Sequence, residues 1–99
     1  MKNGYKIFWS QNALDELTKT IEYLETNFSE KELRKLALKL EDVIESISKS
    51  PNIYPESDYK KIHRAVILKF NTLYYRVKGN NIEILSFFSN RQNPEKRKM

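Results

Sequence analysis

The sequence contains no cysteine, one histidine, two glycines and three prolines. The absence of cysteine excludes disulfides and thiolate metal sites, and it fits a cytoplasmic location. A single histidine cannot build a histidine metal cluster, and no spacing of carboxylates indicates an ion site, so we expect no metal and no other cofactor. Two isolated glycines, Gly4 and Gly79, cannot form a glycine-rich phosphate loop.

Long apolar runs are also absent. No segment approaches the roughly 18 consecutive apolar residues that a membrane-spanning helix needs. The first ten residues have no apolar run leading to a small-residue cleavage site, so we expect no signal peptide. A length of 99 residues with 39% apolar and 31% charged side chains fits one globular domain over residues 1–99.

The charge is divided unevenly along the chain. Residues 1–59 carry 8 Lys and Arg against 11 Asp and Glu, whereas residues 60–99 carry 10 against 2. A basic half beside an acidic half indicates a polyanionic partner for the basic half. A solvated basic surface explains the same numbers, so charge by itself does not identify a function.

Two helices are predicted between residues 11 and 49. Apolar residues recur at steps of three and four in both segments, which is the period of one helix face. Ser10 and Ser29 are suited to cap the two starts, Glu32 to complete a capping box, and Pro51 to end the second helix. The predicted stripes are Leu14, Leu17, Ile21, Leu24 and Phe28, then Leu33, Leu36, Leu40, Val43 and Ile47, widened by Ala37 and Ile44.

Four strands complete the predicted fold, over residues 5–9, 62–68, 73–77 and 82–88, with a hairpin turn at 79–81. Residues 51–61 are expected to form a loop, and residues 90–99 a flexible basic tail. The expected fold is α+β: a helical hairpin on one face of a four-stranded, mainly antiparallel sheet, in the order β-α-α-β-β-β. A dimeric coiled coil is the alternative for the two helices, but short stripes joined by a tight turn more often pack on a sheet.

Basic and aromatic residues of the second half form the candidate binding set. Arginine holds phosphate through two parallel hydrogen bonds, and tyrosine stacks on bases. Tyr75 alternates with Leu73 and Val77, which favours a core position, and Arg76 is explained equally well as an exposed strand charge. His63 reads most simply as a strand-edge residue. The set consists of Lys60, Lys61, His63, Arg64, Lys69, Tyr74, Tyr75, Arg76, Arg91, Lys96, Arg97 and Lys98.

Three stretches resemble the RelE/ParE toxin superfamily over nearly the whole chain. The opening YKIFWSQNALDELTKTIEYL is similar to the family's first strand and helix. HRAVILKFNTLYYRVKGNNIEIL is similar to its arginine-led strand and Tyr-Arg-Val hairpin, and SNRQNPEK to its closing His-x-Arg-Arg-Asp-Pro pattern. The resemblance implies a toxin of a type II toxin–antitoxin system, of the plasmid-stabilisation kind, neutralised by a cognate antitoxin. It also implies a homodimer or a heterotetramer with the antitoxin as possible assemblies.

Within that superfamily, RelE-like members cut mRNA on the ribosome and ParE-like members block DNA gyrase. Arg64 and Arg91 match the family's basic positions. Ser89 stands where a closing histidine is common, Gln92 replaces a second arginine, and Asn71 falls near an arginine of the nucleases. These departures favour a ParE-like toxin without chemistry of its own. Its target contacts would then be Lys60, Lys61, Arg64, Arg76, Arg91, Lys96 and Arg97.

Two alternatives stay open at this point. The first is a ribosome-dependent endoribonuclease, in which Arg64 and Arg91 stabilise charge and His63 moves protons. The second is an inactive domain that only binds its antitoxin.

Overall fold

The computed structural model describes residues 4–56 and 61–90, and its elements follow the predicted order β-α-α-β-β-β. Two helices pack against one face of a four-stranded sheet whose strand order is β1-β4-β3-β2. The β2, β3 and β4 strands form an antiparallel meander, and β1 pairs with β4 in parallel, so the sheet is mixed. The elements are β1 (Lys6–Trp9), α1 (Gln11–Asn27), α2 (Glu30–Lys49), a 3-10 turn (Pro51–Ile53), β2 (His63–Ile67), β3 (Asn71–Lys78) and β4 (Asn81–Ser89).

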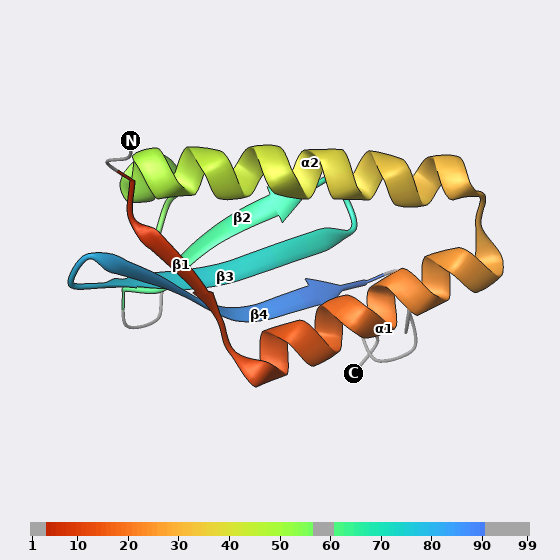
Figure 1. Cartoon of the computed structure of the whole chain (residues 1–99), viewed down its shortest axis with the longest axis horizontal. Coiled ribbons are helices and arrows are strands. Elements are labelled where there is room, and N and C mark those ends of the chain that lie inside the picture. The colour runs from red at the N-terminus through yellow and green to blue at the C-terminus, as the bar shows by residue number, and fades with distance from the viewer. Residues whose placement is uncertain (1–3, 57–60, 91–99) are drawn as a thin grey trace.

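The helices meet at a tight turn and spread apart from it, α1 along β4 and α2 along β2 (Figure 1). The β1 strand crosses the open end of this V, from the end of α2 to the start of α1 (Figure 1). The predicted folded-back hairpin is therefore confirmed, and the coiled coil is not formed. No helix in the described part of the chain is long and apolar enough to cross a bilayer.

The core lies between the helices and the sheet. Buried side chains from every strand of the meander meet those of both helices, which removes the apolar stripe of each element from water. The fully buried set is Ala13, Leu24, Leu36, Val43, Ile47, Ala65, Ile67, Leu73, Tyr75, Ile82, Ile84 and Phe87.

The rotation of α1 differs from the sequence prediction. Leu14 and Phe28 were expected to face the core, but 41% and 42% of their surfaces are exposed. Ala13 and Thr20 are buried instead, and the Thr20 hydroxyl donates to the Glu16 carbonyl at 3.0 Å. The predicted stripe is thus confirmed at Leu24 and at the partly buried Leu17, and wrong at Leu14 and Phe28. Polar contacts between α1 and β4 help to fix this rotation of the helix.

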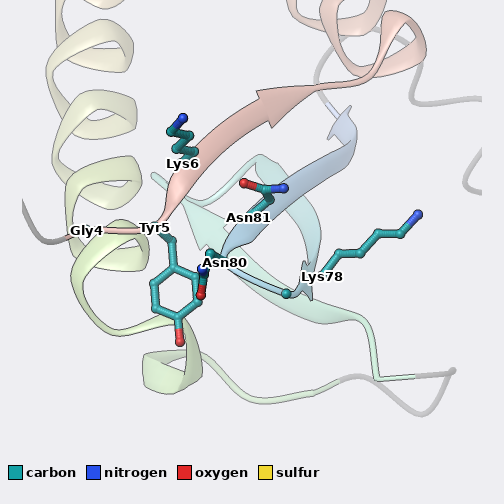
Figure 2. A pocket seen from close by; sticks show the side chains of 7 residues that line it. Gly4, Tyr5, Lys6, Lys78, Asn80 and Asn81 are labelled. Atoms are coloured by element: carbon teal, nitrogen blue, oxygen red, sulfur yellow. The ribbon is translucent and has the colours of Figure 1, made fainter.

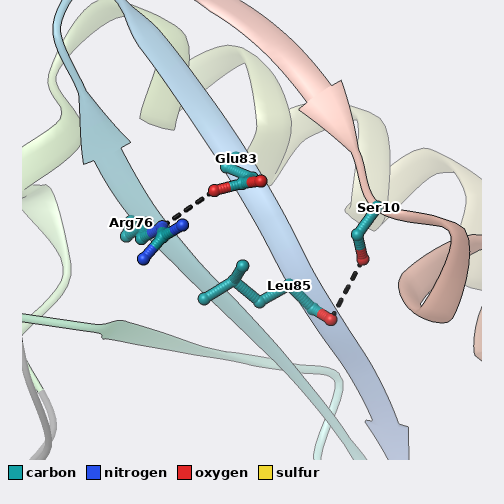
Figure 3. Close-up of polar contacts among 4 residues, drawn as sticks. All are labelled: Ser10, Arg76, Glu83 and Leu85. Atoms are coloured by element: carbon teal, nitrogen blue, oxygen red, sulfur yellow. Dashed lines mark hydrogen bonds and ion pairs between the residues drawn. The ribbon is translucent and has the colours of Figure 1, made fainter.

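The start of α1 is fastened to an irregularity in β4. The β3–β4 register shifts between Tyr74 and Tyr75, which leaves Leu85 as an extra residue in β4. The Leu85 carbonyl accepts from the Ser10 hydroxyl at 3.2 Å (Figure 3). It also accepts from the Asn12 amide at 3.1 Å. Ser10 also caps α1, since its Oγ accepts from the Ala13 N–H at 3.0 Å.

The second helix begins as predicted but without the predicted capping bond. Ser29 is the N-cap residue, yet its side chain makes no capping hydrogen bond. The Glu32 carboxylate lies instead 3.7 Å from Lys35. The Ser29 half of the predicted capping box is therefore not formed, and the acidic residues of the first turn, Glu30 and Glu32, favour the helix start through the helix dipole.

Candidate interaction surface on the open face of the sheet

The pairing registers arrange side chains in rows across the face of the sheet that points away from the helices. Cross-strand partners share a face, so each row joins one residue from each neighbouring strand. We call this surface the open face. Its rows are Lys6, Asn81 and Lys78; Phe8, Glu83 and Arg76; Tyr74 and Arg64; and Phe88, Thr72 and Val66.

Arg64 of the edge strand β2 and Tyr74 of β3 are direct cross-strand partners on the open face. Arg64 is exposed, and its backbone N–H donates to the Pro55 carbonyl at 3.1 Å, which fixes the strand that carries it. Tyr74 is half-buried. Side chains of direct partners lie about 5 Å apart at Cβ, so the Arg64 and Tyr74 side chains leave the sheet next to each other.

Arg76 and Glu83 form an ion pair in the adjacent row. The Arg76 Nε donates to a Glu83 carboxylate oxygen at 2.8 Å (Figure 3). Their side chains are 45% and 34% exposed, so the pair is open to solvent and contributes little to stability. Arg76 is thus an exposed strand charge, as predicted, with part of its charge directed to Glu83.

The open face also carries exposed apolar side chains, one on β1 and two in the row farthest from the β3–β4 hairpin. Val66 is 57%, Phe8 51% and Phe88 41% exposed, although each lies on a regular strand. Aromatic, aliphatic and arginine side chains in one patch are typical of the centre of a protein–protein interface.

His63 lies on the other side of the sheet from Arg64. It is only 5% exposed and stacks on Tyr75, with ring centroids 4.9 Å apart and an angle of 13° between the planes. Its Nδ1 lies 2.8 Å from the Tyr54 carbonyl. A carbonyl only accepts, so Nδ1 carries the proton in this contact.

Tyr75 lies in the core, as its alternation with Leu73 predicted, and it contacts the segment between α2 and β2 that His63 also contacts. Its hydroxyl donates to the Pro51 carbonyl at 2.6 Å. Burial raises the pKa of Tyr75 to about 12. Together His63 and Tyr75 anchor the turn that leads from α2 towards β2, and with it the approach to Arg64.

The structure brings together some of the predicted contact residues and separates others. Arg64 and Arg76 both lie next to Tyr74 on the open face, Arg64 across on β2 and Arg76 two residues along β3. Exposed Lys61 precedes β2 with a left-handed φ of 59°. His63 does not join them. The predicted positions Lys60, Arg91, Lys96, Arg97 and Lys98 lie outside the described residues.

Sequence reasoning missed several residues of the open face, namely Lys6, Phe8, Val66, Lys78, Glu83 and Phe88. Strand alternation was a usable signal, because it separates His63 from Arg64 and pairs Phe8 with the face of Lys6. No three carboxylate or histidine side chains in the described ranges gather in a way that could hold a metal ion.

A comparison with protein families gives one match over most of the chain. The family model described as "ParE toxin of type II toxin-antitoxin system, parDE" matches residues 7–94. Among curated proteins, none is significantly similar to the chain in sequence.

Solved structures with the same fold include several toxins. A chain of the chromosomal ParDE toxin–antitoxin system from P. aeruginosa has a TM-score of 0.71 at 15% identity, covering 86% of this chain and 95% of that one. The YoeB/ParE toxin from Agrobacterium tumefaciens has a TM-score of 0.61 at 16% identity, with coverages of 85% and 96%. The YoeB–YefM complex from Staphylococcus aureus has a TM-score of 0.57 at 20% identity, with coverages of 86% and 95%.

Proposed function

This chain belongs to the family of ParE toxins of type II toxin–antitoxin systems, and we propose that it stops growth by binding DNA gyrase through the open face, without bond-making chemistry of its own. It would act in the cytoplasm, where gyrase works on DNA. The family makes it the toxin component of such a system. The burial of His63 and the side chains of the open face support gyrase as the target.

The burial of His63 carries the proposal. It is the only histidine in the chain, and histidine is the side chain best suited to proton transfer near neutral pH. A general base must come within hydrogen-bonding reach of the proton that it takes. With 5% of its surface exposed and Nδ1 bonded to the Tyr54 carbonyl, His63 has little access to a bound substrate, which supports a function without proton transfer.

The make-up of the open face points in the same direction. Its exposed Phe8, Val66 and Phe88 accompany Arg64 and the half-buried Tyr74. A nuclease groove needs cations and proton-transfer groups, whereas a docking surface needs apolar and aromatic anchors with arginine among them. The second description fits this set of side chains better.

A cognate antitoxin is the proposed physiological partner. The structurally similar YoeB chain was solved as a complex with YefM, and another similar chain belongs to the E. coli DinJ–YafQ toxin–antitoxin complex. We expect co-expression with its own antitoxin to restore growth. A homodimer or a heterotetramer with the antitoxin is the expected assembly, which light scattering of the purified complex measures.

A ribosome-dependent endoribonuclease is the second candidate, favoured by one observation. The Glu83 carboxylate and the Arg76 guanidinium lie one row from Arg64 and Tyr74 on the open face, which puts a potential base near two cations. In this reading Arg64 and Arg91 would stabilise charge, as the family resemblance implies.

One experiment separates these functions. The toxin is induced in cells carrying a DNA-damage reporter, transcript integrity is followed in parallel, and the purified protein is added to a gyrase supercoiling assay. Growth arrest with reporter induction, intact transcripts and blocked supercoiling is expected. Cut transcripts with normal supercoiling would establish the nuclease instead. Normal growth in the presence of soluble toxin would leave a domain that only binds its antitoxin.

A further inference from the structure

Two lysines flank an asparagine at the hairpin end of the open face. Lys6 of β1 pairs with Asn81 of β4, and Asn81 pairs with Lys78 of β3, so the three side chains stand abreast on adjacent strands. All three residues are exposed. Neither lysine takes part in an ion pair among the described residues, in contrast to Arg76 in the next row. We call these three residues the basic row.

A hollow of about 710 Å³ lies at the basic row. Figure 2 shows Lys6 and Lys78 extending outward in different directions, with Asn81 between them. The lining contains no carboxylate. Its side chains end in ammonium, amide and phenol groups, which favours an anion over a cation or an apolar ligand. The lining residues are Gly4, Tyr5, Lys6, Lys78, Gly79, Asn80 and Asn81.

The backbone under the basic row is held in place by the end of α2. The Tyr5 N–H donates to the Ser48 carbonyl at 2.9 Å, and the Ser48 hydroxyl donates to the Tyr5 carbonyl at 3.0 Å. A Cβ at Gly4 would come within 2.5 Å of the Ser48 Oγ, so glycine permits this close approach. The Lys6 N–H then donates to the Asn80 carbonyl at 3.2 Å, which ties β1 to the hairpin.

We propose that Lys6, Asn81 and Lys78 bind the phosphodiester backbone of a nucleic acid. Neighbouring strands lie about 4.8 Å apart, so the two lysines are rooted roughly 10 Å from each other with an amide between them. This spacing allows the ammonium groups to contact phosphates on a backbone laid across the three strands. Backbone contacts of this kind come mainly from lysine, arginine and amide groups and need no base recognition.

An acidic protein surface is a poorer fit for the basic row. Protein interfaces depend on apolar and aromatic anchors. Two of the exposed anchors of the open face, Val66 and Phe88, lie in the row farthest from Lys6 and Lys78, whereas Phe8 lies in the row next to them. The basic row itself contains no apolar side chain, which favours phosphate over a protein surface at this position. This inference does not rest on gyrase as the target, because DNA and RNA present the same phosphodiester group.

The test measures binding of the full chain to two labelled probes by fluorescence anisotropy, over a series of salt concentrations. One probe is a 20-base-pair DNA duplex and the other a single-stranded RNA of the same sequence. The variant Lys6→Gln with Lys78→Gln is compared with Lys19→Gln with Lys39→Gln. The control removes the same two charges from exposed positions on α1 and α2, and thermal melting shows that each variant is folded.

Removal of the basic row is expected to weaken binding at least tenfold at low salt and to lower the slope of log affinity against log salt by about 2, roughly 1 for each lost phosphate contact. The helix control should change the affinity by less than about twofold. Loss for the DNA probe alone, or for the RNA probe alone, identifies which nucleic acid supplies the backbone. An unchanged slope in the basic-row variant, an equal loss in the control, or no binding of the wild-type protein at low salt would overturn the proposal.

The supercoiling assay distinguishes a failure of the phosphate-binding proposal from a failure of the gyrase proposal. If wild-type protein inhibits gyrase while the basic-row variant binds both probes normally, only the phosphate site is wrong. If nucleic-acid binding depends on the basic row but wild-type protein leaves gyrase active, only the gyrase target is wrong.

Discussion

A carboxylate oxygen of Glu16 in α1 accepts a 2.9 Å hydrogen bond from the backbone N–H of Phe87 in β4, 71 positions along the chain. The same oxygen accepts from the Ser86 hydroxyl at 2.7 Å. The pairing of β1 with β4 ends at Ile84. Beyond that residue, side chains of α1 form hydrogen bonds with the backbone N–H and C=O groups of β4 that a neighbouring strand would otherwise bind. A helix thus covers the rest of an edge that would otherwise be open to pairing with another chain.

Replacing Glu16 is expected to loosen α1 from the sheet. Glu16→Ala leaves the Phe87 N–H and the Ser86 hydroxyl without this acceptor, and an unsatisfied buried donor costs about 1–3 kcal/mol. The free energy of unfolding in urea should fall by that amount, and less in Glu16→Gln, which keeps an acceptor oxygen. Glu22→Ala, at an exposed position of the same helix, should change it by less than about 0.5 kcal/mol. Equal effects of Glu16→Ala and Glu22→Ala would contradict the role of Glu16.

Tyr75 gives the fold a predicted sensitivity to alkali. Its pKa is raised to about 12 in the folded protein, against an ordinary value of 10.0, so the folded state keeps a proton that the unfolded state has lost between these pH values. The contribution of Tyr75 to the free energy of unfolding is therefore fully present below about pH 10. It falls by roughly 2–3 kcal/mol as the pH rises towards 12. Urea unfolding at several pH values measures this loss.

Tyr75→Phe is the matched variant for that measurement. It removes the titrating group, so the part of the alkaline loss due to Tyr75 should disappear. It also leaves the Pro51 carbonyl without its 2.6 Å donor, which lowers stability by about 1–3 kcal/mol at neutral pH. A variant that loses stability between pH 10 and 12 as steeply as wild type would show that Tyr75 is not the titrating group.

Arg64 is expected to act on the target and not on the fold. Arg64→Ala should raise the toxin concentration that half-inhibits supercoiling about 30-fold, as the loss of a central interface arginine worth about 2 kcal/mol does. The midpoint of thermal unfolding should stay close to wild type, because Arg64 is exposed. Arg34→Ala, an exposed arginine on α2, is the control and should inhibit like wild type. Addition of Arg91→Ala to Arg64→Ala tests whether Arg91 contributes further.

The Arg76–Glu83 pair should matter little for stability. A double-mutant cycle with Arg76→Gln and Glu83→Gln is expected to give a coupling energy of about 0.2–1 kcal/mol, and less at high salt, because both side chains are partly exposed. If the nuclease reading were correct, Glu83→Gln would abolish transcript cleavage without a change in stability. A coupling of several kcal/mol would show that the pair supports the fold itself.

Periodicity, turn residues and charge, taken from the sequence alone, determined the element order and the antiparallel meander. They also placed Tyr75 in the core and Ser10 at the start of α1. These features follow from local chemistry: alternation in strands, steps of three and four in helices, and hydroxyls that satisfy free N–H groups. The same rules placed Leu17 and Leu24 of α1 correctly against the core but also assigned the exposed Leu14 and Phe28 to it.

Only the tertiary structure decided how distant segments meet. The parallel pairing of β1 with β4, the extra residue at Leu85 and the bonds from Glu16 to that strand set the rotation of α1. The same register gathered Lys6 and Lys78 into one row and left Arg64 and His63 on opposite sides. Local sequence carries the preferences of neighbours along the chain, whereas strand order and register are selected by the burial of one common core, to which the whole chain contributes.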